Sequence, residues 1–323
     1  MPIFEEINAH DDYITSITQL KNGYLVSTSL DKTAKVWNIN DDSIKISESF
    51  FYKFDKHSDG ITSLVELSDG NIATASYDYT VKIWNLNNLK KNKTTEENID
   101  FSGDIKNEIT LEGHDWVVSK VIQLRNGLIA SSSWDKTIKL WDPKNNYNLN
   151  KTILAHDDII TDIKEINNGL LISSSADKSI KLWNLNETYN FLLKNYTDIS
   201  VKINSISIIS ENKFATGSED NKLRIWDIKD INNPKTHILE AHVDPILFVG
   251  DIDKNIIVTG SKDNSMIFWE KKFNDFDLYF WIFIIVLILI IKLIGFIIIK
   301  YFYIKKKSIV DDDPLNKYDY TLI

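Results

Sequence analysis

The chain has 323 residues and no cysteine, which excludes a disulfide scaffold and a thiolate metal site and agrees with a reducing compartment. Its formal net charge of −9 argues against a nucleic-acid-binding protein, because such proteins normally carry a basic stripe. Length alone would allow two domains, so the domain organisation has to come from patterns along the chain.

One motif recurs six times: Ser-x-Asp, followed six residues after the Asp by Trp. In five copies a His stands 21 positions before the Asp. The period between tryptophans is close to the roughly 40–45 residues expected of four-stranded propeller blades. The repeats end near Trp37, Trp84, Trp141, Trp183, Trp226 and Trp269, and the histidines are His10, His57, His114, His156 and His242. The array predicts one domain over residues 1–272.

Each copy predicts three short strands and two tight turns. In the first copy an alternating run begins at Ile14, and two further strands surround Thr28 and Val36. The second turn holds the Asp of the motif. The first turn contains Asn-Gly or Asp-Gly in four copies, and these dipeptides supply the two positive-φ residues of a type I′ hairpin. They are Asn22-Gly23, Asp69-Gly70, Asn126-Gly127 and Asn168-Gly169.

These residues closely resemble the WD-repeat (WD40) family, with Trp-Asp at Trp141-Asp142 and Trp226-Asp227 and Gly-His at Gly113-His114. The resemblance covers residues 1 to about 272 and implies an all-β, six-bladed WD40 β-propeller. It also implies a hydrogen-bond network among the His, Ser, Asp and Trp of each blade. The hydroxyl of this network is either the Ser two residues before the Asp or the Ser/Thr four residues before it. Both positions are filled in every copy.

The family's blade order places the segment before each His as the outer strand of the preceding blade. On that basis Ile3–Ile7 pairs with the last blade and closes the ring, which removes exposed sheet edges. Too few residues precede His10 or follow Trp269 for a seventh blade. The fifth blade departs from the pattern, with Ile199 at the His position and Glu211-Asn212 in the first turn. We expect it to be the least rigid blade.

Two segments do not follow the repeat. Residues 88–107 are polar and predict a long, mobile surface loop. Leu278–Ile299 is apolar except for Lys292, and a helix of this length would span about 33 Å, enough for a membrane. Its aliphatic residues and phenylalanines favour insertion by roughly 5–11 kcal/mol, against at most about 3 kcal/mol for the lysine. We expect one C-terminal transmembrane helix over 278–299 and a polar tail over 300–323.

The orientation of this segment has two interpretations. No signal peptide precedes the propeller, which favours a cytosolic propeller with a tail anchor in an endomembrane such as the endoplasmic reticulum. Lys305, Lys306 and Lys307 follow the helix and favour a cytosolic tail instead. The last four residues, Tyr320–Ile323, match a short sorting signal and a PDZ-domain ligand pattern. Both patterns are too short to decide between the two orientations.

Ser, His and Asp recur in every blade, so blade architecture accounts for them without a catalytic triad. A phosphate-binding loop and a dinucleotide-binding glycine motif are both absent from the sequence. Only His237 lies outside the repeat pattern, which is too few histidines for a metal site without cysteines. We therefore expect no enzyme activity, no small-molecule substrate, no cofactor and no metal.

Two tryptophans, Trp116 and Trp134, belong neither to the repeat positions nor to the apolar segment. The family resemblance places residues just after the His and just before the Asp on one face around the central channel, where partners commonly bind. Trp and Tyr provide large contact areas at low entropy cost. The candidate partner-binding residues are Tyr13, Leu30, Tyr77, Trp116, Trp134 and Ile159.

The sequence thus predicts a membrane-anchored scaffold that presents a propeller face to a protein or peptide partner. A second hypothesis is a substrate receptor of a cullin-RING ubiquitin ligase, because Phe214–Lys229 resembles the box of such receptors. A third, suggested by layout alone, is a membrane-bound regulator or exchange factor for a small GTPase in vesicle trafficking.

Overall fold

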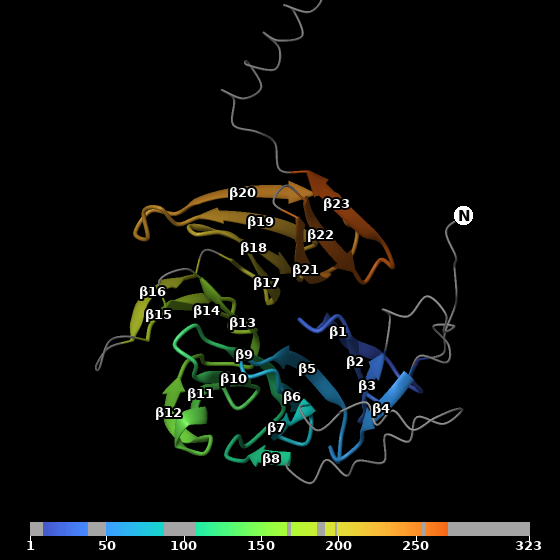
Figure 1. The fold of residues 1–323 in the computed structure, drawn as a ribbon. Coiled ribbons are helices and arrows are strands. Elements are labelled where there is room, and N and C mark those ends of the chain that lie inside the picture. Colours follow the sequence, from blue (N-terminus) through green and yellow to red (C-terminus); the bar gives the residue numbers. More distant parts are fainter. Residues whose placement is uncertain are drawn as a thin grey trace, which may run out of the picture. The chain divides into compact units, whose positions relative to one another are not determined.

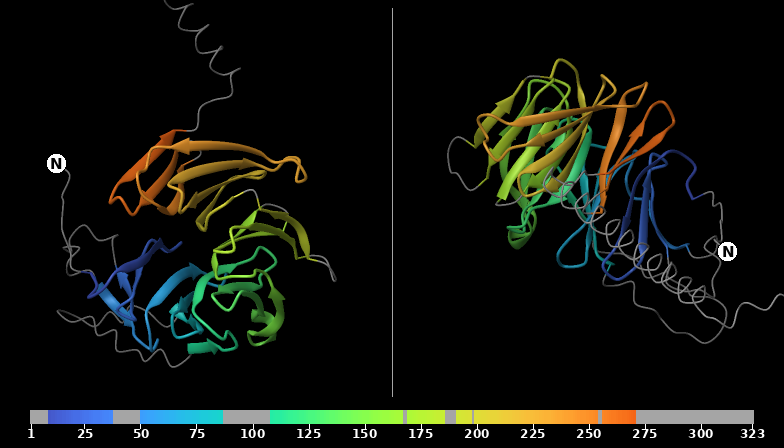
Figure 2. Two further views of the ribbon diagram at one scale, coloured as in Figure 1. Left: turned by 180° about the vertical axis from the view of Figure 1, so that it is seen from behind. Right: turned by 90° about the horizontal axis from the view of Figure 1, so that it is seen from above.

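The computed structural model describes residues 9–37, 50–86, 108–166, 169–185, 191–197, 199–253 and 256–270. Within them, six antiparallel sheets follow one another in chain order around a common centre (Figure 1 and Figure 2). Five sheets have four strands and the sixth has three. The prediction of an all-β, six-bladed propeller over the repeat region is therefore confirmed, and Met1–Trp269 form one compact unit.

The first three blades have their innermost strand first in sequence. Blade one consists of β1 (Ile14–Gln19), β2 (Leu25–Ser29), β3 (Ala34–Trp37) and β4 (Phe50–Phe54). Blade two consists of β5 (Ile61–Glu66), β6 (Ile72–Ser76), β7 (Val81–Trp84) and β8 (Glu108–Leu111). Blade three consists of β9 (Val118–Gln123), β10 (Ile129–Ser133), β11 (Thr137–Asp142) and β12 (Asn148–Leu154), with the short 3-10 helix η3 (Pro143–Asn145) between its last two strands.

The remaining blades repeat this order. Blade four consists of β13 (Ile160–Ile166), β14 (Leu170–Ser175), β15 (Ile180–Asn184) and β16 (Leu192–Tyr196). Blade five consists of β17 (Ile203–Ser210), β18 (Lys213–Ser218), β19 (Lys222–Asp227) and β20 (Lys235–Glu240). Blade six consists of β21 (Ile246–Asp253), β22 (Ile256–Ser261) and β23 (Met266–Glu270).

The first hairpin turn of the blades is not the one that the sequence predicted. The backbone N–H of Gly23 donates to the carbonyl of Leu20 at 2.8 Å, and Leu20 N donates to Tyr24 O at 2.7 Å. Gly23 has a φ of 89°, while Asn22 has no positive φ. Gly70 and Gly127 behave in the same way. At these three turns the type I′ prediction was wrong, because a three-residue loop needs only one left-handed residue, and the glycine supplies it. Asn168 of the fourth turn lies outside the described residues.

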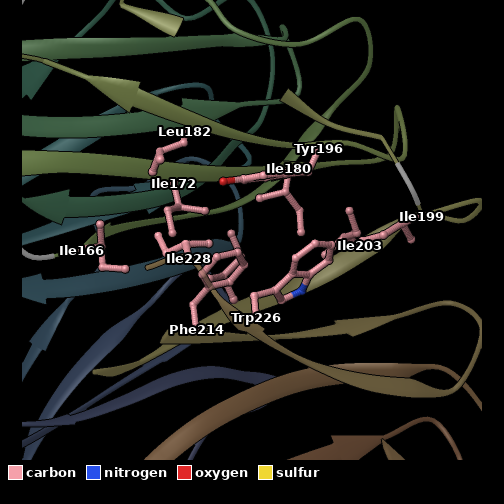
Figure 3. Close-up of a cluster of buried hydrophobic side chains, with 11 residues drawn as sticks. Ile166, Ile172, Ile180, Leu182, Tyr196, Ile199, Ile203, Phe214, Trp226 and Ile228 are labelled. Carbon is pink, nitrogen blue, oxygen red and sulfur yellow. The ribbon is translucent and has the colours of Figure 1, made fainter. Parts of the chain in front are cut away.

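The hydrophobic core lies between neighbouring blades rather than inside a single blade. In the cluster between blades four and five, Ile172 and Leu182 lie in the same buried group as Phe214 and Trp226 (Figure 3). The Phe214 and Trp226 rings stack at a centroid distance of 5.7 Å. Burial of each such side chain contributes roughly 1.5–3 kcal/mol. Each blade therefore depends on its neighbours for stability, as in other repeat proteins.

Blades one and six are neighbours in the order of the ring. The apolar side chains between them are more exposed to solvent than those between the other blades. Ile14 on β1 is 47% exposed, although the residues at the same register on the five other innermost strands are fully buried. On β23, Met266 is 64% exposed and Phe268 is 62% exposed. Two apolar faces thus remain accessible to solvent in the part of the chain that the structure describes.

The strand predicted to close the ring, Ile3–Ile7, lies outside the described residues, as does the predicted loop at 88–107. The spacing of the other blades supports the closing strand. Strands β4 and β8 end three residues before His57 and His114, and β12 and β20 end two residues before His156 and His242. An offset of two or three residues from His10 places the end of the predicted strand at Ile7 or Asn8. Ring closure by this segment therefore remains our prediction.

A labelling experiment in the naturally cysteine-free chain can test closure. We predict that Ile14→Cys and Phe268→Cys react slowly with a maleimide in the intact chain, because closure brings blades one and six together. Deletion of residues 2–8 should raise both rates to that of the exposed control Thr152→Cys. Equal rates with and without residues 2–8 would show that this segment does not close the ring.

Candidate functional site

A buried hydroxyl joins Trp and His in each of five blades. In blade one the indole Nε1–H of Trp37 donates to Ser27 Oγ at 2.8 Å, and Ser27 Oγ lies 2.7 Å from His10 Nε2. His10 Nδ1 lies 2.8 Å from Asp31 Oδ2. The network hydroxyl is therefore the one four residues before the Asp. These hydroxyls belong to Ser27, Thr74, Ser131, Ser173 and Thr259.

The Ser two residues before the Asp has a different role, because it connects two loops at one end of the blade. Ser29 Oγ donates to the carbonyl of Asp12 and accepts from the backbone N–H of Asp31, both at 3.0 Å. The backbone N–H of Leu30 also donates to Tyr13 O at 3.0 Å. The loop after the His and the turn around the Asp are thus held together. Side chains on these loops gain fixed positions.

Burial and hydrogen bonding act in opposite directions on the network carboxylates. Burial alone would raise the pKa of Asp31, but hydrogen bonds from Thr33, His10 and two backbone N–H groups lower it to about 2. The pKa values of Asp78, Asp135 and Asp177 lie even further below their usual range, for the same reasons. Burial lowers the pKa of His156, which keeps its imidazole neutral. In blade four the Asp177 carboxylate therefore accepts the Nδ1–H of the His156 ring.

This Ser–His–Asp order resembles a catalytic triad, but its chemistry is structural. The hydroxyl oxygen already accepts from the indole N–H, so its own proton points to His Nε2. Ser131 and Thr74 are fully buried, and Ser27 is almost so. A substrate carbonyl could not approach such an oxygen. The network instead satisfies buried polar groups that would each cost about 1–3 kcal/mol if left unpaired.

Blade five replaces the missing imidazole with a guanidinium group from another strand. Ile199, at the His position, is buried beside Trp226 in the apolar cluster between blades four and five. Arg224 on β19 donates from Nη2 to Asp220 Oδ2 at 2.5 Å and from Nη1 to Ser218 Oγ at 2.8 Å. Burial would raise the pKa of Asp220, but these bonds hold it below its usual value. The sequence analysis did not find this replacement; the expectation that blade five is the least rigid stays a prediction.

Three of the six predicted partner-binding residues form one aromatic cluster. Trp134 makes edge-to-face contacts with Tyr77, at a ring-centroid distance of 5.6 Å, and with Trp116, at 5.8 Å. The backbone N–H of Trp134 donates to Val117 O at 2.9 Å, so the two loops of blade three are tied as in blade one. Trp116 is 48% exposed. We call Tyr77, Trp116 and Trp134 the aromatic cluster.

The other predicted residues lie on equivalent loops of their blades. Leu30 packs on the backbone of Gly60, where an added Cβ would come within 2.9 Å of Leu30 Cδ2. Tyr13 is largely exposed, and the half-buried Ile159 accepts a backbone bond from Ala176. Among the described residues, no contact between the Tyr13 ring and the rings of the aromatic cluster is seen, and Ile159 has no ring. The sequence analysis missed Tyr79, an exposed ring on blade two at the position after the Asp, where the other blades have Lys or Asn.

Comparison with known proteins agrees with this geometry. The family model described as "WD domain, G-beta repeat" matches residues 2–38, 48–85, 105–142, 147–184 and 192–227, together more than half of the chain. A solved structure, that of the WD40 beta propeller domain of Doa1, is similar with a TM-score of 0.64 and 20% sequence identity, over 82% of this chain and 81% of that one. At this identity the likeness concerns the fold. Comparison with curated proteins gave no match.

We predict that Arg224→Ala destabilises the protein by about 1–3 kcal/mol, because it leaves the partly buried Asp220 carboxylate without its cation. Arg224→Lys should recover part of the loss, since an ammonium group restores the charge but not the two-pronged geometry. The measurement is urea unfolding of both variants. Lys213→Ala, which breaks an exposed ion pair to Asp227, is the control and should cost at most about 1 kcal/mol. Equal losses for Arg224→Ala and the control would refute the replacement role.

Proposed function

Because the chain belongs to the WD-repeat family, we propose that it is a membrane-anchored scaffold whose propeller face captures a protein or peptide partner. The family supports the general role, since its propellers typically act as non-enzymatic interaction platforms. The observation that carries the finer proposal is the aromatic cluster of Tyr77, Trp116 and Trp134 on the loops of blades two and three.

The cluster has the physical properties of a binding hot spot. Its rings support one another through edge-to-face contacts, each contributing roughly 0.5–1.5 kcal/mol beyond burial. The loops beneath the rings are fixed by the bonds of Ser133 Oγ to Trp116 O, at 3.1 Å, and to the backbone N–H of Asp135, at 3.0 Å. Such rings lose little freedom when a partner binds, so most of the contact energy becomes affinity. Leu30, Tyr13 and Ile159 extend the surface to blades one and four.

The membrane anchor is the second part of the proposal. Residues 278–299 lie outside the described residues, and no helix in the part of the chain that the structure describes is long and apolar enough to cross a membrane. The composition of 278–299 supports insertion, with a favourable balance of several kcal/mol. We propose a cytosolic propeller attached to an endomembrane, with residues 300–323 as the tail on the other side.

The ligase-receptor and GTPase-regulator hypotheses are more specific forms of the same scaffold. Both need a particular second partner, either a cullin adaptor or a small GTPase. The box-like segment Phe214–Lys229 spans β18 and β19, and there Arg224 is bound to Asp220. Lys229 stands where ligase receptors prefer Arg. We therefore retain the general scaffold as the proposed function.

The aromatic cluster can be tested by its removal. We predict that Trp134→Ala combined with Tyr77→Ala abolishes partner capture, because the two changes remove the centre of the contact surface, while the thermal midpoint stays nearly unchanged. Proximity labelling from the intact membrane-bound protein, followed by recapture of the labelled proteins on purified wild-type and variant chains, measures this. Leu154→Ala with Leu193→Ala, on exposed outer strands, is the matched control. Capture that survives the aromatic changes would reject this face as the site.

The anchor can be tested by extraction and glycosylation. We predict that the full chain resists alkaline carbonate extraction and that deletion of 278–299 releases it, because this segment supplies the apolar span. An acceptor site added after residue 323 should be glycosylated, whereas the exposed sequon at Asn150 should stay unmodified. Release of the intact chain by carbonate would exclude the anchor. Glycosylation at Asn150 would reverse the proposed orientation.

A further inference from the structure

The loops that carry the aromatic cluster are acidic. Two residues after the His, most blades have an Asp, and Asp12, Asp59 and Asp158 each accept a hydrogen bond from the next backbone N–H at 2.7 Å. This bond fixes the carboxylate at the loop while the residue stays exposed. Blade three has Trp116 at this position and an exposed aspartate, Asp115, directly before it.

Negative charge is in excess on the face over blades one to four. The loops of blades one to four carry six exposed aspartates after the His: Asp11, Asp12, Asp59, Asp115, Asp157 and Asp158. The turns of the same blades carry three lysines: Lys32, Lys136 and Lys178. Lys32 Nζ donates to the carbonyl of Ser58 at 3.0 Å, which places its charge on the loop that carries Asp59; the six aspartates still outnumber the three lysines. On blade five, by contrast, Glu219 is balanced by Lys202, at 3.8 Å.

Two of these carboxylates belong to the same loops as the aromatic rings. Asp115 is adjacent in sequence to Trp116, and its backbone N–H is anchored to Asp135 Oδ2 at 3.0 Å. Asp59 precedes Gly60, whose carbonyl accepts the backbone N–H of Tyr77 at 2.8 Å. Rings and carboxylates therefore come from the two loop pairs that the blade networks hold in place.

This combination selects for a cation with a flat apolar surface. The faces of Trp and Tyr rings attract positive charge, by roughly 0.5–2 kcal/mol for each contact. A guanidinium group can stack on a ring and still direct N–H groups to a carboxylate, while an ammonium group acts only as a point charge. An acidic or phosphorylated segment would meet like charge at Asp59 and Asp115. Electrostatic complementarity therefore favours a basic partner over an acidic or phosphorylated one.

We infer that the partner presents a basic linear segment whose arginine packs on Trp116 and Trp134 and pairs with Asp59 and Asp115. This inference rests on the proposed function, because it names the chemistry of the partner that the aromatic cluster captures. A basic segment also fits the net charge of the chain, which at −9 attracts cationic ligands at long range.

The test uses full-length protein in detergent and four pools of fluorescent 12-residue peptides. The pools have random flanks and a fixed central Arg, Lys, Gln or Glu. The Arg pool should bind about tenfold more tightly than the Gln pool, more tightly than the Lys pool, and less tightly as salt is raised. Asp59→Asn with Asp115→Asn should weaken Arg-pool binding about tenfold and leave Gln-pool binding unchanged. Glu211→Gln, at the far end of β17, is the control and should change neither.

The outcomes separate the inference from the proposed function. If the Gln or Glu pool binds as tightly as the Arg pool, or if the two Asp→Asn changes have no effect, the arginine inference is overturned. The proposed face would then still stand, provided that Trp134→Ala with Tyr77→Ala abolishes the binding. If no pool is retained by the wild-type chain, the arginine inference falls, and the recapture experiment with Trp134→Ala and Tyr77→Ala decides the proposed function by itself. If the retained pools ignore the aromatic changes, the inference falls and this face is rejected as their binding site.

Discussion

The structure depends on one buried hydroxyl in each of five blades, which is shared between an indole N–H and an imidazole. Ser27 in blade one connects Trp37 on β3 to His10 before β1, and His10 in turn binds Asp31 in the turn after β2. One chain of hydrogen bonds therefore spans the blade and ends at its loops. Loss of any member would leave a buried polar group unpaired. This constraint explains why four residue types recur at fixed spacing and how the loops of the proposed partner-binding face are held in place.

The blades and their strands could be predicted because this network fixes residue types and spacing in the sequence itself. The choice between two hydroxyls could not, since Ser27 and Ser29 are both polar and, two residues apart on β2, point to the same face. Their positions along the strand separate them: Ser29 ends β2 and bonds to the loop, whereas Ser27 bonds to Trp37. The type I′ prediction was wrong because Asn-Gly fits more than one turn, and loop length decides between them. Arg224 was missed because it reaches Asp220 from a position where most other blades carry Lys.

The residues of the candidate face could be predicted from the sequence, but the contacts among them could not. The repeat places Trp116 and Trp134 on neighbouring loops, and the excess of Trp over the repeat pattern identified them. Their edge-to-face packing, and the contact of Trp134 with Tyr77 of blade two, depend on how blades two and three pack against each other. That geometry comes from the apolar cluster between these blades, in which Val81 lies with Val118 and Trp141. Spacing within one repeat carries no information about it.

Departures from the repeat are of two kinds. One keeps the structure of the blade through a compensating residue, and the other adds an exposed side chain that the blade does not need for stability. At the His position of blade five, the loss of an imidazole comes with a new cation, Arg224, so the carboxylate keeps a partner. At Trp116, an Asp found in most blades is replaced by a half-exposed ring, and another departure, Trp134, packs on it. A large exposed ring gives a blade less stability than a buried one would. The fold compensates the first departure and gains little stability from the second, which is why we centre the proposed binding site on blade three rather than on blade five.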